Sequence, residues 1–76
     1  MIIKILGTGC PKCKKLEENA RLAIAELGIS ATVEKVTELD KIMDYGVMMT
    51  PALVIDEKVV SSGKLLSASD IKALIK

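Results

Sequence analysis

The chain has 76 residues, of which half are hydrophobic and 28% are charged, and its 11 basic and 10 acidic side chains nearly cancel. This length and composition are typical of one small globular domain, so we expect residues 1–76 to form a single domain. The balanced charge argues against binding of a nucleic-acid backbone, which needs a concentrated basic surface. No segment approaches the ~20 apolar residues of a membrane helix, and the apolar start is too short for a signal peptide. We therefore expect a cytoplasmic monomer.

The first half of the chain predicts a strand, a helix and a second strand. The run Ile2–Leu6 is apolar, β-branched and bounded by glycine, which is typical of a short buried strand. A helix should begin at Cys10 or Pro11, because proline suits the first helical turn, and should end at Gly28. Its apolar residues recur at spacings of three and four, which places them on one face: Cys13, Leu16, Ala20, Ala23, Ile24 and Leu27. Residues 31–36 predict the second strand, which should run parallel to the first.

A short second helix should follow. Thr37 and Asp40 have the spacing of a capping box, which predicts that the helix begins after Thr37. Gly46 should end it. The apolar side of this helix is expected to consist of Leu39, Ile42 and Met43.

The last third of the chain predicts a hairpin and a third helix. Residues 52–55 and 58–61 read as strands, and only Asp56 and Glu57 separate them, which indicates a tight antiparallel turn. Ser67 and Asp70 form a second capping box in front of the last helix. Its apolar residues are Ile71, Leu74 and Ile75, and Leu66 is the expected staple partner of Ile71. The resulting order is β-α-β-α-β-β-α, an α/β fold with a mixed four-stranded sheet and helices on both faces.

The chemistry of the chain is concentrated in its two cysteines, which no histidine accompanies. Cys10 should lie at the helix N-terminus, where unpaired backbone N–H groups and the helix dipole favour a thiolate. Pro11 stiffens the turn and Lys12 adds positive charge. Cys13 lies one turn further on, facing the core. We expect Cys10 to attack a substrate disulfide, and Cys13 then to attack Cys10 and release the reduced substrate.

Pro51 is the second informative position, because it directly precedes an apolar strand that should lie near the cysteines. Most X–Pro bonds in folded proteins are trans. A cis bond here would turn Thr50 outward, so that its backbone could pair with an extended substrate segment. Met48 and Met49 either fill the core or, if exposed, form an adaptable apolar surface beside the thiols.

These motifs resemble the thioredoxin–glutaredoxin superfamily, and within it the short archaeal and bacterial proteins called small redox-active disulfide proteins. The resemblance rests on Gly9-Cys10-Pro11-Lys12-Cys13 after the first strand and on the segment from Tyr45 to Leu53. It implies a thioredoxin-like fold, Cys10 as nucleophile and Cys13 as resolving thiol. It also implies a cis Thr50–Pro51 bond, a glycine beside the active site at Gly63, and a protein disulfide as substrate.

The chain departs from the thioredoxin pattern at three places. Gly9 stands where thioredoxins have tryptophan, Pro11-Lys12 replaces Gly-Pro, and Lys4 aligns with their buried acid. We expect a dithiol–disulfide oxidoreductase that serves electron transport and cell redox homeostasis with no cofactor beyond the Cys10–Cys13 disulfide. A reductase or another thiol should supply the electrons, and no metal, membrane or nucleic acid should take part.

Two other functions use the same cysteines. Heavy-metal-associated domains also place a CxxC after their first strand, and two thiolates suit Cu(I). Their βαββαβ order would need a hairpin after the first helix and a strand at the end. The chain could instead be a binding module that uses the cysteines only as a redox switch.

Overall fold

The computed structural model describes residues 1–9 and 11–75. Its elements are β1 (Ile2–Leu6), α1 (Pro11–Leu27), β2 (Thr32–Val36), α2 (Leu39–Asp44), β3 (Ala52–Ile55), β4 (Lys58–Ser62) and α3 (Ala68–Ile75). This is the predicted order, and it confirms the α/β fold class. A βαββαβ chain would have a hairpin after α1 and a final strand, whereas this chain has α2 after β2 and ends with α3.

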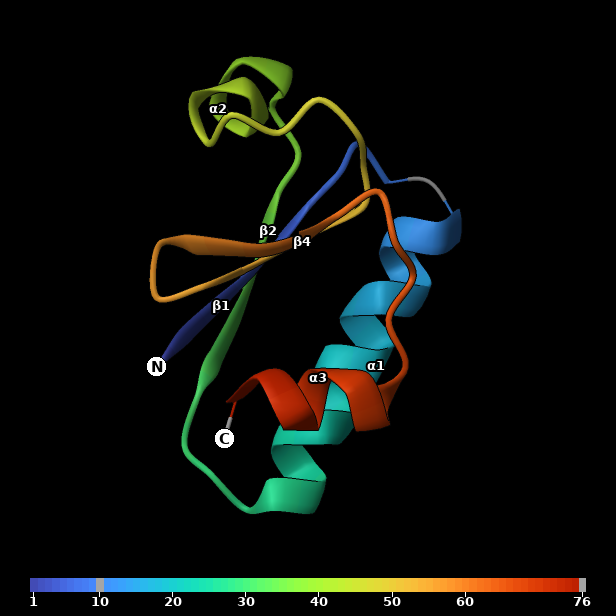
Figure 1. Cartoon of the computed structure of the whole chain (residues 1–76), viewed down its shortest axis with the longest axis vertical. Helices are drawn as coiled ribbons and strands as arrows, with labels where there is room; N and C mark the ends of the chain where they lie inside the picture. The colour runs from blue at the N-terminus through green and yellow to red at the C-terminus, as the bar shows by residue number, and fades with distance from the viewer. Residues whose placement is uncertain (10, 76) are drawn as a thin grey trace.

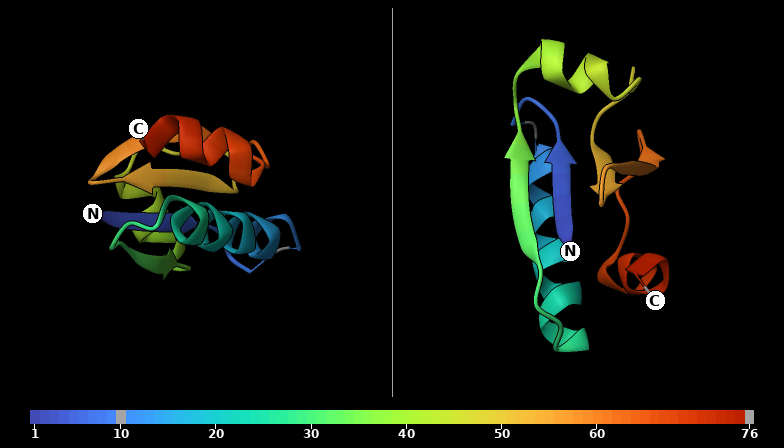
Figure 2. Two further views of the ribbon diagram at one scale, coloured as in Figure 1. Left: turned by 90° about the horizontal axis from the view of Figure 1, so that it is seen from below. Right: turned by 90° about the vertical axis from the view of Figure 1, so that its left-hand side faces the viewer.

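The four strands form one mixed sheet in the order β2-β1-β3-β4 (Figure 1). Strand β1 is parallel to β2 and antiparallel to β3, and β3 is antiparallel to β4. Figure 2 shows α1 lying along β1 and β2, as expected for the crossover helix of a β-α-β unit, with α2 beyond the ends to which both strands point. The loop from β1 into α1 therefore lies at the same end of the sheet as α2.

The sheet buries apolar side chains on both faces, because successive residues of a strand point to opposite sides. On the face covered by α1 and α3, the core contains Ile3, Ile5, Leu16, Ala20, Ala23, Leu53 and Ile71. On the opposite face, where α2 contributes Ile42, the core contains Leu6, Ile42, Val47, Ala52 and Val54. The predicted arrangement, with helices on both faces, is confirmed.

Two local signals act as the sequence predicts. Helix α1 ends at Gly28, whose φ of +66° suits glycine and whose N–H donates to the Ile24 carbonyl at 3.0 Å. The β3–β4 turn holds both Asp56 and Glu57 at positive φ, 49° and 69°, as a two-residue hairpin turn of type I′ requires.

The prediction for α2 was wrong at its start and on its apolar side. The helix begins at Leu39, and its N-cap residue Glu38 has extended backbone angles and makes no side-chain capping bond. The chain thus stays extended past Thr37. Of the three predicted apolar residues only Ile42 is buried, while Leu39 and Met43 are exposed. A helix of six residues is too short to turn a wide face onto the sheet.

Helix α3 has the predicted capping box. The Asp70 N–H donates to Ser67 Oγ at 3.1 Å, and the Ser67 N–H donates to Asp70 Oδ2 at 3.3 Å. Ile71 is fully buried and Leu66 packs against the same core, as expected for a staple. Leu74 was predicted to pack on the sheet but remains 43% exposed.

None of the helices in the described ranges combines the length and the apolar character that crossing a bilayer requires.

Ser67→Ala should lower the free energy of unfolding by about 1 kcal/mol, because it removes the N-cap hydroxyl and leaves the Asp70 N–H without that acceptor. Urea unfolding measures this change. Ser69→Ala, two residues into the same helix, is the matched control and should be neutral or slightly stabilising. An equal loss in both variants would show that the hydroxyl of Ser67 does not cap α3.

Candidate active site

Cys13 lies in the first turn of α1, with its side chain turned toward the sheet. The residue is 5% exposed and its sulfur is part of a disulfide. Pro11 begins the helix, and both Pro11 and Lys12 are exposed beside it. The predicted nucleophile, Cys10, lies outside the described residues.

Gly7 lies directly behind Cys13, at the end of β1. It is buried, and a β-carbon added there would overlap the Cys13 sulfur and come within 3.0 Å of the Cys13 β-carbon. The sulfur therefore occupies space that a side chain at position 7 would take. From the sequence, Gly7 is only the glycine that bounds the first strand, because its contact with Cys13 is created by the fold.

The segment that contains Pro51 meets Cys13 at this point. The Thr50–Pro51 peptide bond is cis, Pro51 is buried and Thr50 is exposed. The added β-carbon at Gly7 would lie 3.9 Å from that of Thr50, so Cys13 and Thr50 are both close neighbours of Gly7. The fold thus brings together two motifs that are far apart in the sequence.

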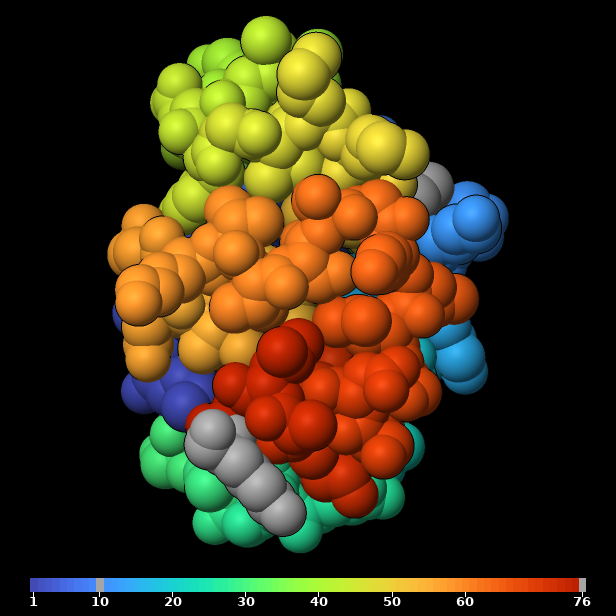
Figure 3. All heavy atoms as spheres, in the orientation of Figure 1, coloured from blue at the N-terminus to red at the C-terminus, as the bar shows by residue number. Residues whose placement is uncertain are grey.

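Gly63 joins the same cluster from the end of β4. Its N–H donates to the Pro51 carbonyl at 2.9 Å, and a β-carbon added to it would lie 3.1 Å from that of Met49. Figure 3 shows the yellow segment around residue 50 packed against the orange segment that follows β4. Met49 is largely exposed and Met48 is 97% exposed. Of the two interpretations of these methionines, core filling is therefore wrong.

A small pocket of about 70 Å³ lies beside Cys13, between α1 and the sheet. Ile5 and Gly7 contribute to it from the β1 side, and Cys13 and Glu17 line it from successive turns of α1. Gly9 and Lys14 line it, as do Lys35 and Thr37. Of the predicted site residues that the structure describes, Cys13 and Gly9 line this pocket, whereas Pro11 and Lys12 do not.

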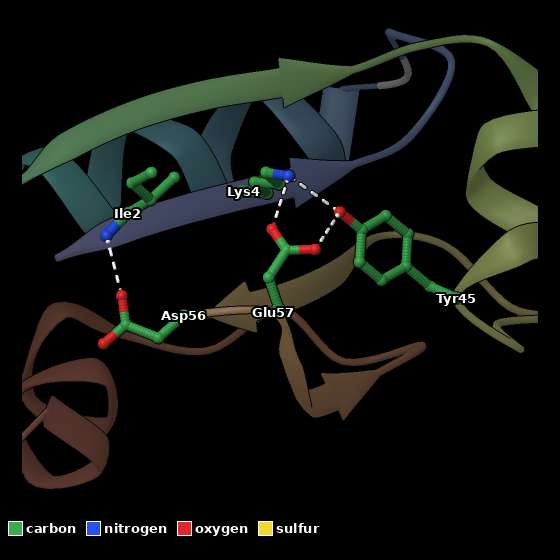
Figure 4. Close-up of polar contacts among 5 residues, drawn as sticks. All are labelled: Ile2, Lys4, Tyr45, Asp56 and Glu57. Carbon is green, nitrogen blue, oxygen red and sulfur yellow. Dashed lines mark hydrogen bonds and ion pairs between the residues drawn. The ribbon is translucent and has the colours of Figure 1, made fainter.

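Lys4 lies on the other side of the sheet and does not line this pocket. Its ammonium donates to Glu57 Oε1 at 2.6 Å and to the Tyr45 hydroxyl at 2.8 Å, and that hydroxyl donates to Glu57 Oε2 at 3.1 Å (Figure 4). The hydrogen bond to Glu57, and then that to Tyr45, raises the pKa of Lys4. The same bond from Lys4 lowers the pKa of Glu57. Lys4 is thus a charged link between β1, the end of α2 and the hairpin turn.

Comparison with known proteins identifies the family. The whole chain, residues 1–76, matches the family described as the thioredoxin domain. The chain belongs to the thioredoxin family. It is 43% identical over 75 residues to a thioredoxin of Methanothermobacter thermautotrophicus, covering 99% of this chain and 97% of that one. It is 42% identical over 76 residues to a thioredoxin of Methanocaldococcus jannaschii, covering 100% of this chain and 87% of that one.

The fold has a counterpart among solved structures. The structure of a malarial protein superimposes with a TM-score of 0.67 over 97% of this chain and 91% of that one, at 21% identity. That identity shows a shared fold alone. Together these comparisons confirm a short thioredoxin-like protein, and at the level of the family the chain is a thiol–disulfide oxidoreductase.

Gly7→Ala should lower the free energy of unfolding by about 1–3 kcal/mol, because the new methyl group overlaps the Cys13 side chain. Urea unfolding under reducing conditions measures this without a contribution from disulfide closure. In a Cys13→Ala background the sulfur is gone, so the same substitution should cost clearly less. An equal cost in both backgrounds would show that the sulfur is not the obstacle.

Glu57→Gln should weaken the dependence of stability on acid pH. A carboxyl whose pKa is lower in the folded state contributes stability fully above its unfolded value, here 4.5, and loses that contribution as the pH falls through the folded value. The free energy of unfolding should therefore fall less steeply below this pH in the variant. The change should be small, because solvent screens an exposed pair.

Urea unfolding across the acid range is the measurement for Glu57→Gln. Glu34→Gln, at an exposed position of β2, is the control and should keep the slope of the unmodified chain. If Glu57→Gln keeps that slope as well, the contact with Lys4 does not contribute to stability in solution.

Proposed function

We propose that this chain reduces disulfides of other proteins through the dithiol formed by Cys10 and Cys13. The observation that carries the proposal is the place of Cys13, a buried, disulfide-bonded cysteine at the start of α1 that shares Gly7 as a neighbour with Thr50. A thiol that is shielded from solvent is suited to intramolecular attack rather than to attack on an external substrate. The attack on the substrate disulfide is therefore assigned to Cys10.

The reaction proceeds through two thiol–disulfide exchange steps. The Cys10 thiolate attacks one sulfur of the substrate disulfide, forms a mixed disulfide and releases the other sulfur as a thiolate. Cys13, as thiolate, attacks the Cys10 sulfur, and the second substrate sulfur leaves with the electron pair. The substrate gains two electrons, and the Cys10–Cys13 pair loses them and becomes a disulfide.

The surface around Thr50 supports an extended protein segment as substrate. Thr50 is exposed next to a cis proline, and the exposed side chains of Met48 and Met49 adjoin it. Methionine is flexible and polarizable, so it adapts to different apolar partners. An extended segment that pairs with the backbone at Thr50 would bring its disulfide toward the start of α1.

The cycle also needs an electron donor and a suitable compartment. A reductase or another thiol returns the pair to the dithiol state, since the reaction consumes one dithiol per substrate disulfide. A reducing compartment such as the cytoplasm suits a cysteine pair that alternates between dithiol and disulfide, and does not suit a permanent structural disulfide. The chain acts as a monomer and needs no cofactor beyond its own cysteines.

Reduction of insulin by the pre-reduced chain tests the proposal in a single turnover. Cys10→Ser should abolish the reaction, because it removes the attacking sulfur. Cys13→Ser should start the reaction but stop at the mixed disulfide, because the resolving thiol is absent. Thiol alkylation and mass analysis follow the protein disulfides and the trapped adduct.

The two single variants control each other, since both keep one cysteine. If the unmodified chain reduces no accessible disulfide and Cys10→Ser behaves identically, the proposal is wrong. An adduct trapped through Cys13 in the Cys10→Ser variant, at the rate of the unmodified chain, would reverse the assigned roles.

A further inference from the structure

The second exchange step needs a proton acceptor. Cys13 is buried, and burial makes a thiol hold its proton more firmly, because the thiolate loses its hydration. Cys13 must nevertheless become a thiolate before it can attack the mixed disulfide. The chain contains no histidine, which is the side chain that most often takes this role. At neutral pH hydroxide is scarce, so a carboxylate near Cys13 is the side chain suited to accept this proton.

Glu17 is the carboxylate that lines the pocket beside Cys13. The two residues are four positions apart on α1, so their side chains lie on the same helix face, with β-carbons about 5–6 Å apart. The Glu17 side chain is 15% exposed, which places it largely between the helix and the sheet. The pocket of about 70 Å³ exceeds the space of roughly 10–15 Å³ that one water needs. A water there can bridge a thiol and a carboxylate.

The carboxylate is held in place from two elements. Arg21, one turn further along α1, donates to Glu17 Oε2 at 2.9 Å, and Lys35 on β2 lies 3.4 Å from Oε1. Lys35 is the register partner of Ile5 on β1, so the strand pairing puts the ammonium at this pocket. Lys14 also lines it from α1. These contacts hold the carboxylate between α1 and β2, at the pocket that Cys13 also lines.

We propose that Glu17 accepts, through a water in this pocket, the proton that Cys13 loses as it attacks the mixed disulfide. The proton moves from the Cys13 sulfur to the water while a proton of that water moves to Glu17. The Cys13–Cys10 bond then forms, and the bond between Cys10 and the substrate breaks. The substrate sulfur leaves as a thiolate, and Glu17 returns its proton to solvent. This inference rests on the proposed function.

The charged neighbours of Glu17 define its pH range. The hydrogen bond from Arg21, and next the contact with Lys35, hold the pKa of Glu17 below its ordinary value of 4.5. Glu17 is therefore a carboxylate, and able to accept a proton, across the whole neutral range. The contribution of Glu17 is lost only as the pH falls through that lowered value.

The test separates the two exchange steps with 5,5′-dithiobis(2-nitrobenzoate) as the probe. The reduced chain should release two coloured thiolates in succession, the first from attack by Cys10 and the second from resolution by Cys13. Glu17→Gln should leave the first rate within about two-fold and slow the second at neutral pH by about 10- to 100-fold, toward the range expected of a general base. The second rate of the variant should rise with pH toward that of the unmodified chain, because hydroxide then replaces the carboxylate.

Glu18→Gln is the matched control, because Glu18 is the exposed neighbour that pairs with Lys15 and does not line the pocket. It should leave both rates unchanged. Glu17→Asp keeps the carboxylate and should restore part of the second rate. Urea unfolding of each variant shows whether the loss of the Arg21 and Lys35 contacts alters the fold.

The outcomes distinguish this inference from the proposed function. If the unmodified chain never releases a second thiolate, the two-step reaction itself is wrong. If it releases both, but Glu17→Gln resolves as fast as Glu18→Gln at every pH, Glu17 is not the acceptor and the reaction stands. If Glu17→Gln slows both steps equally and the pH profile does not change, Glu17 has only a structural role, as a partner in ion pairs.

Discussion

The contact between Gly7 and Cys13 is the constraint on which the arrangement of the site depends. The Cys13 sulfur lies against the end of β1 because residue 7 has no side chain there. This close approach lets the first turn of α1 pack onto the sheet with its cysteine buried. Thr50 also lies near this glycine, so the start of the helix and the proline segment both approach the end of β1 at one small residue.

The alternation of side chains along β1 divides the molecule into two chemical halves. Ile3, Ile5 and Gly7 face α1, and they contribute to the core and to the pocket beside Cys13. Lys4 and Leu6 face the other side, where Leu6 joins the α2 core and Lys4 pairs with Glu57 and Tyr45. The positive charge in β1 is therefore separated by the sheet from the thiol chemistry. The carboxylate that lines the pocket beside Cys13 is Glu17 of α1.

Charge and burial around Cys13 fit a thiol that reacts within the chain. Its pocket is small and lies beneath the helix, while the apolar side chains of Met48 and Met49 are outside and accessible. The pocket at Cys13 and the exposed methionines are therefore separate surfaces of the site. Lys35 and Arg21 both form ion pairs with Glu17, which lines the pocket.

The sequence by itself determined the order of the elements, the hairpin turn at Asp56 and Glu57, the capping box at Ser67 and the helix face that carries Cys13. Each of these depends on residues a few positions apart, so the pattern contains the physical cause. Only the tertiary structure decided which short segments meet: Gly7 with Cys13, Glu17 with Lys35, and Lys4 with Glu57. It also decided that Leu39 and Met43 stay exposed, because α2 is too short to bury a full apolar face. These outcomes depend on long-range packing and strand register, which no local periodicity encodes.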